Sequence, residues 1–193
     1  MGLLLVGLVL FLGVHAVTIL RPQRDALIGR VGEGAYKGIY SLVSLIGFVV
    51  LIYGYGAARL SSANIVFWTP PAFLGHVAAL LMLFAFIALA ATYAPNGLIK
   101  STLKHPMITA VKAWAFAHLL VNGDLASIIL FGSFLAWGVI DRISLKRRPD
   151  ASEPPKAGFG AGDIAAIGIG TVATIVMMIW LHPILIGVPA SLR

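Results

Sequence analysis

The chain contains no cysteine, and this absence removes several kinds of site. Without thiols it cannot form disulfides, bind haem through a thiolate or carry an iron–sulfur cluster on its own residues. Charged residues are also scarce, at 11% of the chain against about 25% in soluble domains. Hydrophobic residues make up 60%, and the mean hydropathy is +0.98. The composition therefore excludes an ordinary soluble enzyme and places the chain in a membrane.

Long apolar segments recur along the chain, and most approach the roughly 20 residues that a spanning helix needs. We predict an all-α integral membrane bundle of about six transmembrane helices, forming a single domain over residues 1–193. A stretch rich in proline and glycine, about 146–162, is expected to be a mobile cytoplasmic loop. The fourth and fifth segments are short and form either a tight hairpin or one long broken helix. The segments are Met1–Leu20, Tyr36–Ala57, Pro70–Tyr93, Pro106–Val121, Leu125–Ile140 and Ile164–Ile186.

The basic residues predict an orientation. They gather in the first, third and fifth loops, whereas the even loops hold only Arg59 and the C-terminus only Arg193. By the positive-inside rule the odd loops are cytoplasmic, so both termini lie on the other side of a bacterial inner membrane. The same pattern accounts for the net charge of +7 without a nucleic-acid partner. The odd-loop residues are Arg21, Arg24 and Arg30, then Lys100 and Lys104, then Arg142, Lys146, Arg147, Arg148 and Lys156.

All five histidines lie in or at the edges of apolar segments. An imidazole is costly in hydrocarbon, so such histidines usually face a bundle interior and mark a site. His15 and His118 have small neighbours that would let a flat ligand approach, although hydrogen bonds between helices would also explain them. His76 and His182 lie near the membrane surface, where a histidine needs no function. Several histidines, no thiol and few carboxylates suggest a haem cofactor.

The region around His118 is unusually polar for a membrane segment. Trp114 lies one turn before it, and Asn122 lies one turn after it on the same helical face. Asn122 and Asp124 are candidates to orient the imidazole of an iron ligand. The alternative is turn chemistry, in which Gly123 ends one helix and Asp124 caps the next. Both roles are compatible.

His105 and Lys112 lie at the cytoplasmic end of the fourth segment. His105 precedes Pro106, and proline is favoured in the first turn of a helix. Lys112 either reaches the lipid headgroups or pairs with an acidic group of a ligand, such as a haem propionate.

These residues carry a resemblance to a known family. The chain resembles the NnrU family, small bacterial membrane proteins named from denitrification gene clusters, whose domain also occurs in plant 15-cis-zeta-carotene isomerase. The resemblance implies a haem b held by His15 and His118, with His105 at a further functional position. It covers essentially the whole chain. The matching elements are His15, Lys104-His105-Pro106, the block Ala113–Ser127 and Leu130-Phe131-Gly132.

The predicted topology complicates this pair of ligands. At about 1.5 Å per residue, His15 lies about 20 Å below the outer face and His118 only about 6–9 Å below it. Two axial nitrogens must be about 4 Å apart, each about 2 Å from the metal. The predicted depths in the membrane therefore favour His15 and His105 as one pair of iron ligands, or His118 with either His76 or His182 as another. Helix tilt or a turn at 122–124 that lies within the bilayer would restore His15 with His118.

Three kinds of function follow from these residues. The first is a haem b enzyme that isomerises a cis double bond of a lipophilic polyene such as 15-cis-zeta-carotene. The second is a denitrification-linked haem protein for electron transfer, nitric oxide response or reductase assembly, with no substrate of its own. The third is a cofactor-free structural or transport protein. A transporter would usually show paired broken helices, and this chain shows only one break.

Overall fold

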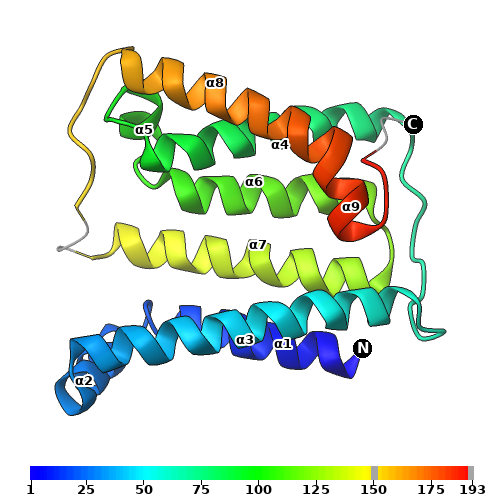
Figure 1. Ribbon diagram of the computed structural model, residues 1–193, viewed down its shortest axis with the longest axis horizontal. Helices are drawn as coiled ribbons and strands as arrows, with labels where there is room; N and C mark the ends of the chain where they lie inside the picture. The colour runs from blue at the N-terminus through cyan, green and yellow to red at the C-terminus, as the bar shows by residue number, and fades with distance from the viewer. Residues whose placement is uncertain (149–151, 191–193) are drawn as a thin grey trace. The chain divides into compact units, whose positions relative to one another are not determined.

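The computed structural model describes residues 1–148 and 152–190, and within them the regular structure is almost entirely helical (Figure 1). This confirms the all-α prediction. The helices are α1 (Gly2–Ala16), α2 (Arg21–Val31), α3 (Glu33–Arg59), α4 (Phe73–Tyr93), α5 (Leu98–Leu103), α6 (Pro106–Val121), α7 (Leu125–Lys146), α8 (Ala161–Val176), a π-helical turn (Met177–Leu181) and α9 (His182–Ile186).

Four helical stretches are long and apolar enough to cross a membrane. They are α3, α4, α7 and the continuous stretch Ala161–Ile186. A fifth is added if α1 and α2, which are bent by 86° at the break between them, count as one broken span. The 16-residue α6 is apolar but shorter. A membrane bundle is therefore supported, but the predicted count of six spans is not confirmed.

Several predicted boundaries were wrong. The first helix ends at Ala16 rather than near Leu20, and the basic stretch expected to be a loop forms α2. Pro22 does not prevent this, because proline in the first turn loses no helical hydrogen bond. The short α5 was not predicted, and α7 continues to Lys146 instead of ending near Ile140.

The loop predicted at about 146–162 agrees with the end of α7 and the start of α8. Residues 149–151 lie outside the described part of the chain. Elsewhere three contacts tie the loop to the α4–α5 region: Asn96 Nδ2 donates to the carbonyl of Pro155 (2.9 Å), Ser101 Oγ to that of Ala157 (3.4 Å), and Lys104 pairs with Glu153 (2.7 Å).

The chain divides into two compact units, and the prediction of a single domain stays a prediction. Unit 1 contains Met1–Trp68 and Asp124–Trp137, and unit 2 contains Thr69–Gly123 and the described part of Gly138–Arg193. Helix α7 thus contributes its first half to unit 1 and its second half to unit 2.

In unit 1, small residues bring α1 and α3 together. A Cβ added to Gly7 would lie 2.6 Å from the Leu51 backbone, and one added to Gly54 would lie 2.6 Å from the backbone nitrogen of Leu4. A Cβ at Gly47 would lie 2.7 Å from the nitrogen of Phe11. Close approach of backbones at glycine is the usual way in which helices associate in lipid. This packing fixes the end of α1 that carries His15.

In unit 2, α4 packs against both α6 and α8. Alanines form most of its buried surface, and Gly170 of α8 lies against the backbone of Ile87. At one end of this unit, the carboxylate of Asp163 accepts hydrogen bonds from the backbone nitrogens of Leu98 (3.0 Å), Ile99 (2.7 Å) and Gly160 (2.8 Å). The first N–H groups of a helix lack internal partners. Asp163 of α8 therefore caps α5 as well as its own helix.

We expect Asp163→Asn to lower the melting temperature of the detergent-purified protein by about 5 °C or more. The amide would place its NH2 group against backbone N–H donors in a site that is 1% exposed. Thermal unfolding followed by circular dichroism measures this. Asp25→Asn, which changes a carboxylate that is 63% exposed, is the matched control. Equal melting temperatures for the two variants would refute the capping role.

Candidate functional site

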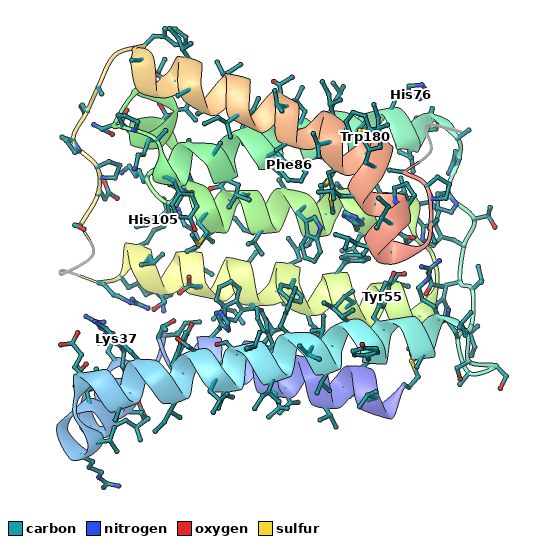
Figure 2. All side chains as sticks on the ribbon, in the orientation of Figure 1. Lys37, Tyr55, His76, Phe86, His105 and Trp180 are labelled. Carbon is teal, nitrogen blue, oxygen red and sulfur yellow. The ribbon has the colours of Figure 1, made fainter. Side chains whose placement is uncertain are left out.

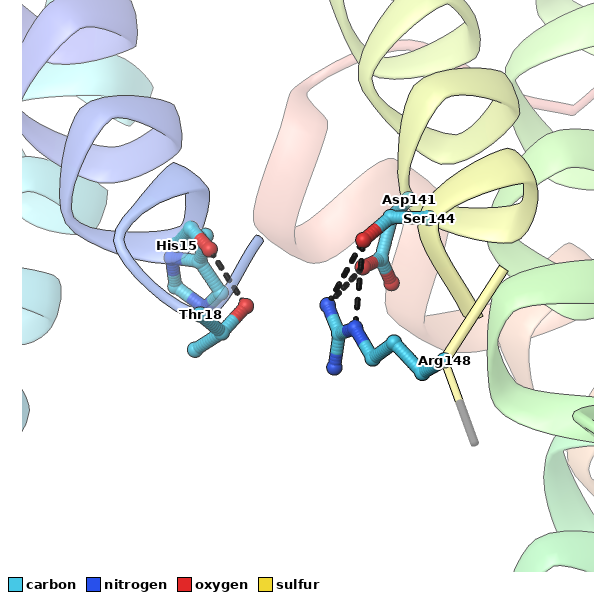
Figure 3. Close-up of polar contacts among 5 residues, drawn as sticks. All are labelled: His15, Thr18, Asp141, Ser144 and Arg148. Carbon is cyan, nitrogen blue, oxygen red and sulfur yellow. Dashed lines mark hydrogen bonds and ion pairs between the residues drawn. The ribbon is translucent and has the colours of Figure 1, made fainter. Parts of the chain in front are cut away.

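His15 lies in the last turn of α1 and is half-buried. Its Nδ1 is 2.6 Å from the carbonyl oxygen of Phe11, one turn earlier. Its own carbonyl accepts a hydrogen bond from Thr18 Oγ1 at 2.6 Å (Figure 3). The imidazole centroid is 4.3 Å from the ring of Phe11, 5.4 Å from Tyr40 and 5.9 Å from Trp137, all in unit 1. The ring therefore sits in aromatic surroundings with one nitrogen anchored.

An apolar cavity of about 130 Å³ adjoins this end of α1. Pockets for drug-sized ligands measure about 300–1,000 Å³. The cavity can therefore admit part of a hydrocarbon chain but not a porphyrin. Its lining comes from α1, the residue that follows it, α2 and α3: Val14, Val17, Leu27, Val31, Tyr36, Ile39 and Tyr40.

His118 lies near the end of α6 in unit 2, and its geometry repeats that of His15. Its Nδ1 is 2.9 Å from the carbonyl oxygen of Trp114, and the two rings are 5.4 Å apart. The predicted closeness of Trp114 and His118 is thus confirmed. Asn122 Nδ2 donates to the carbonyl of His118 at 2.8 Å. This bond holds the backbone at the end of α6 rather than the imidazole.

His15 and His118 adopt the same tautomer, and so does His182, whose Nδ1 also faces a backbone carbonyl. A backbone carbonyl only accepts hydrogen bonds, so the Nδ1 that faces it must carry the proton. In the neutral ring the lone pair is then on Nε2, as a metal ligand requires. His15 and His118 belong to different units, and each is described here within its own unit.

His105 precedes α6, as predicted, and its carbonyl accepts hydrogen bonds from the nitrogen (3.1 Å) and Oγ1 (3.2 Å) of Thr109. Burial, and then the charge of Arg142, lower the pKa of His105. Its neutral form, the one that binds metals, is therefore favoured. Figure 2 labels its side chain at the start of α6.

The remaining histidines have simpler settings. His76 is exposed near the start of α4, and Figure 2 shows it at the edge of the molecule. His182 Nδ1 contacts the carbonyl oxygen of Val188 at 2.5 Å. Within residues 1–148 and 152–190, no group of three or more His, Asp or Glu is placed to hold a metal ion. A haem iron takes four ligands from its porphyrin, so it needs only one or two imidazoles.

Asp124 caps α7, as the turn interpretation predicted. Its Oδ1 accepts from the backbone nitrogen of Ser127 (3.1 Å), and its Oδ2 from Ser127 Oγ (2.6 Å). Partial burial raises the pKa of Asp124, but the hydrogen bonds from Ser127 and Asn64 outweigh it, so the net pKa is lowered. Gly123 follows the C-cap Asn122 of α6, as predicted, but Asn122 is extended and Gly123 is not among the left-handed glycines.

Sequence reasoning missed the extension of this cap to α3. Tyr55 lies 2.9 Å from Ser127 Oγ. Because Ser127 donates to Asp124, Tyr55 is the donor in its bond to Ser127. The Tyr55–Ser127–Asp124 chain therefore ties α3 to the start of α7 inside unit 1. The partners are 72 residues apart, and no local pattern links them.

We expect Ser127→Ala to lower the free energy of unfolding by about 1–3 kcal/mol, because it leaves Tyr55 and Asp124 without a shared partner in a fully buried position. Tyr55→Phe, which removes one donor only, should cost less. Denaturant titration in detergent compares the two variants. A Ser127→Ala protein as stable as wild type would contradict this role.

Comparison with known proteins agrees with the resemblance found in the sequence. The family model described as "NnrU protein" matches residues 3–190. No curated protein and no solved structure matches the chain. Because the match spans nearly the whole sequence, the chain belongs to the NnrU family.

Proposed function

We propose that this protein binds haem b in the membrane through His15 and His118. The observation that carries the proposal is the shared tautomer: in each ring Nδ1 faces the carbonyl one turn earlier, at 2.6 and 2.9 Å. Two imidazoles in aromatic, apolar surroundings form a donor set that suits haem b and the resemblance to haem-binding relatives. His105 is the rival ligand, because the depths predicted from the sequence pair it with His15.

The residues around each imidazole would hold and orient the cofactor. The carbonyls of Phe11 and Trp114 fix the ring rotation, and Asn122 stabilises the end of α6. Aromatic neighbours exclude water and offer flat surfaces to a porphyrin. When bound, the haem would supply a redox-active iron, which His15 and His118 would hold.

The reaction that we propose is cis–trans isomerisation of a lipophilic polyene such as 15-cis-zeta-carotene, without net redox change. It is supported by the resemblance to the isomerase and by the apolar cavity beside His15, whose lining suits a hydrocarbon. Such an enzyme needs one histidine to leave the iron. The second candidate function is electron transfer, nitric oxide response or reductase assembly in denitrification. The anchoring of both rings favours this candidate, because two retained histidine ligands leave no open position on the iron.

The ligands can be tested by absorption spectra of the detergent-purified protein, oxidised and dithionite-reduced. Loss of a residue that only supports a metal ligand typically lowers metal affinity about tenfold or more, and loss of the ligand itself should lower it at least as much. His15→Ala and His118→Ala should therefore each lower haem occupancy about tenfold or more. The exposed His76→Ala is the matched control and should retain the Soret band. Loss of the band in His105→Ala but not in His118→Ala would replace His118 by the rival. Comparable bands in all the variants would end the histidine proposal.

The two reactions differ in the spin state of the iron. An isomerase should show a reduced haem that is partly five-coordinate and high-spin, and it should convert 15-cis-zeta-carotene in liposomes. An electron carrier should stay six-coordinate and low-spin in both oxidation states. A low-spin reduced haem together with no conversion would reject isomerisation.

We also propose an orientation in a bacterial inner membrane with both termini on the non-cytoplasmic side. It requires α6 and the α1–α2 pair to cross in addition to the four long stretches. A reporter active only in the cytoplasm should be silent when fused at either terminus and active when inserted next to Lys156. Activity at one terminus alone would show an odd number of crossings.

A further inference from the structure

A group of positive charges lies where the end of α7 meets the start of α6 in unit 2. A Cβ added to Gly138 would be 2.9 Å from Cγ of Lys112, so the lysine stem crosses α7 at this glycine. Arg142 and Lys146 follow Gly138 at intervals of four residues and so share its face of α7. Both charges act on Lys112. The three side chains Lys112, Arg142 and Lys146 are called the cationic cluster below.

The nearby acids are already engaged. Asp141 pairs with Arg148 at 3.8 Å, and Arg148 also donates to Ser144 Oγ at 3.0 Å (Figure 3). Glu153 pairs with Lys104 at 2.7 Å, and this hydrogen bond lowers the pKa of Glu153, so the pair stays ionised. Each acid thus has a basic partner outside the cationic cluster, and the charge of Arg142 also acts on Glu153.

Arg142 supplies the second observation. Its Nη1 is buried and has no hydrogen-bond partner in the described parts of the chain. A buried charged donor without a partner is costly, and it is usually paired in the working protein. An anion at this position would satisfy Nη1 and relieve the repulsion among the three cations.

The position of the cluster favours a lipid. Arg142 and Lys146 lie in the last turns of α7, and Lys146 is exposed. Lys112 lies about 9 Å along α6 from its start and can extend toward the surface. It lies about 120° around the helix from His118, so it does not share the face of the proposed iron ligand. We therefore propose that the cationic cluster binds the phosphate of an anionic phospholipid headgroup.

This site can be tested by native mass spectrometry of the full-length protein in detergent, titrated with phosphatidylglycerol or phosphatidylcholine. Arg142→Gln and Lys112→Gln should each weaken phosphatidylglycerol binding about fivefold to tenfold and leave phosphatidylcholine binding unchanged. Lys156→Gln removes one exposed charge from the following loop and is the matched control. Equal phosphatidylglycerol affinities in all these proteins would overturn the proposal.

Further variants and a competition experiment distinguish a lipid from free phosphate and from a cofactor carboxylate. Arg142→Lys keeps the charge and should bind phosphatidylglycerol within about twofold of wild type. The double variant Lys112→Gln/Lys146→Gln gives the same test if Arg142→Gln does not fold. Inorganic phosphate at the lipid concentration should not displace the lipid, because it lacks acyl chains, and displacement would identify free phosphate as the ligand. Loss of haem from Arg142→Gln with unchanged lipid binding would assign the cluster to a cofactor carboxylate and reject the lipid.

Discussion

A polar group within hydrocarbon must find its partner inside the protein, because no water is available there. The arrangement of this chain follows from that constraint. Asp163 accepts from the first N–H groups of α5 and from the N–H of Gly160, which precedes its own helix. Asp124 begins a chain of bonds that reaches α3 through Ser127 and Tyr55. The same constraint anchors His15 and His118 on carbonyls of their own helices. Because Nδ1 is held by a carbonyl, only Nε2 could bind a metal. The hydrogen bond that satisfies each buried ring therefore also determines which nitrogen could serve as a ligand.

The sequence was sufficient for the broad architecture. Composition and the length of the apolar segments predicted an all-α membrane bundle. Pro106, the first residue of α6, and Asp124, which precedes α7, marked both helix starts correctly. Helix α2 was missed because its composition is polar and it buries no residue, so no apolar segment marks it in the sequence. The predicted count of six spans is not confirmed, because the first segment is broken after Ala16 and α6 is shorter than the other apolar helices.

The candidate site was predictable only where contacts are local. Trp114, His118 and Asn122 share a helical face, and the structure brings them together as the spacing indicates. Asn122 acts on the backbone rather than on the ring, which spacing alone does not decide. The bond between Tyr55 and Ser127 depends on the packing of distant segments. Lys112 has no partner in its own helix, and only its contact with Gly138 shows that it belongs with Arg142 and Lys146.

The central claim is that the anchored imidazoles hold haem b. The most direct measurement is the haem content per chain of protein expressed with added haem precursor, determined from the pyridine haemochrome and the protein mass. The account predicts one haem b per wild-type chain and essentially none in a His15→Ala/His118→Ala double variant that keeps the helical content of wild type. Wild-type protein with no more haem than this variant would contradict the account, and the two histidines would then serve only to stabilise their helices.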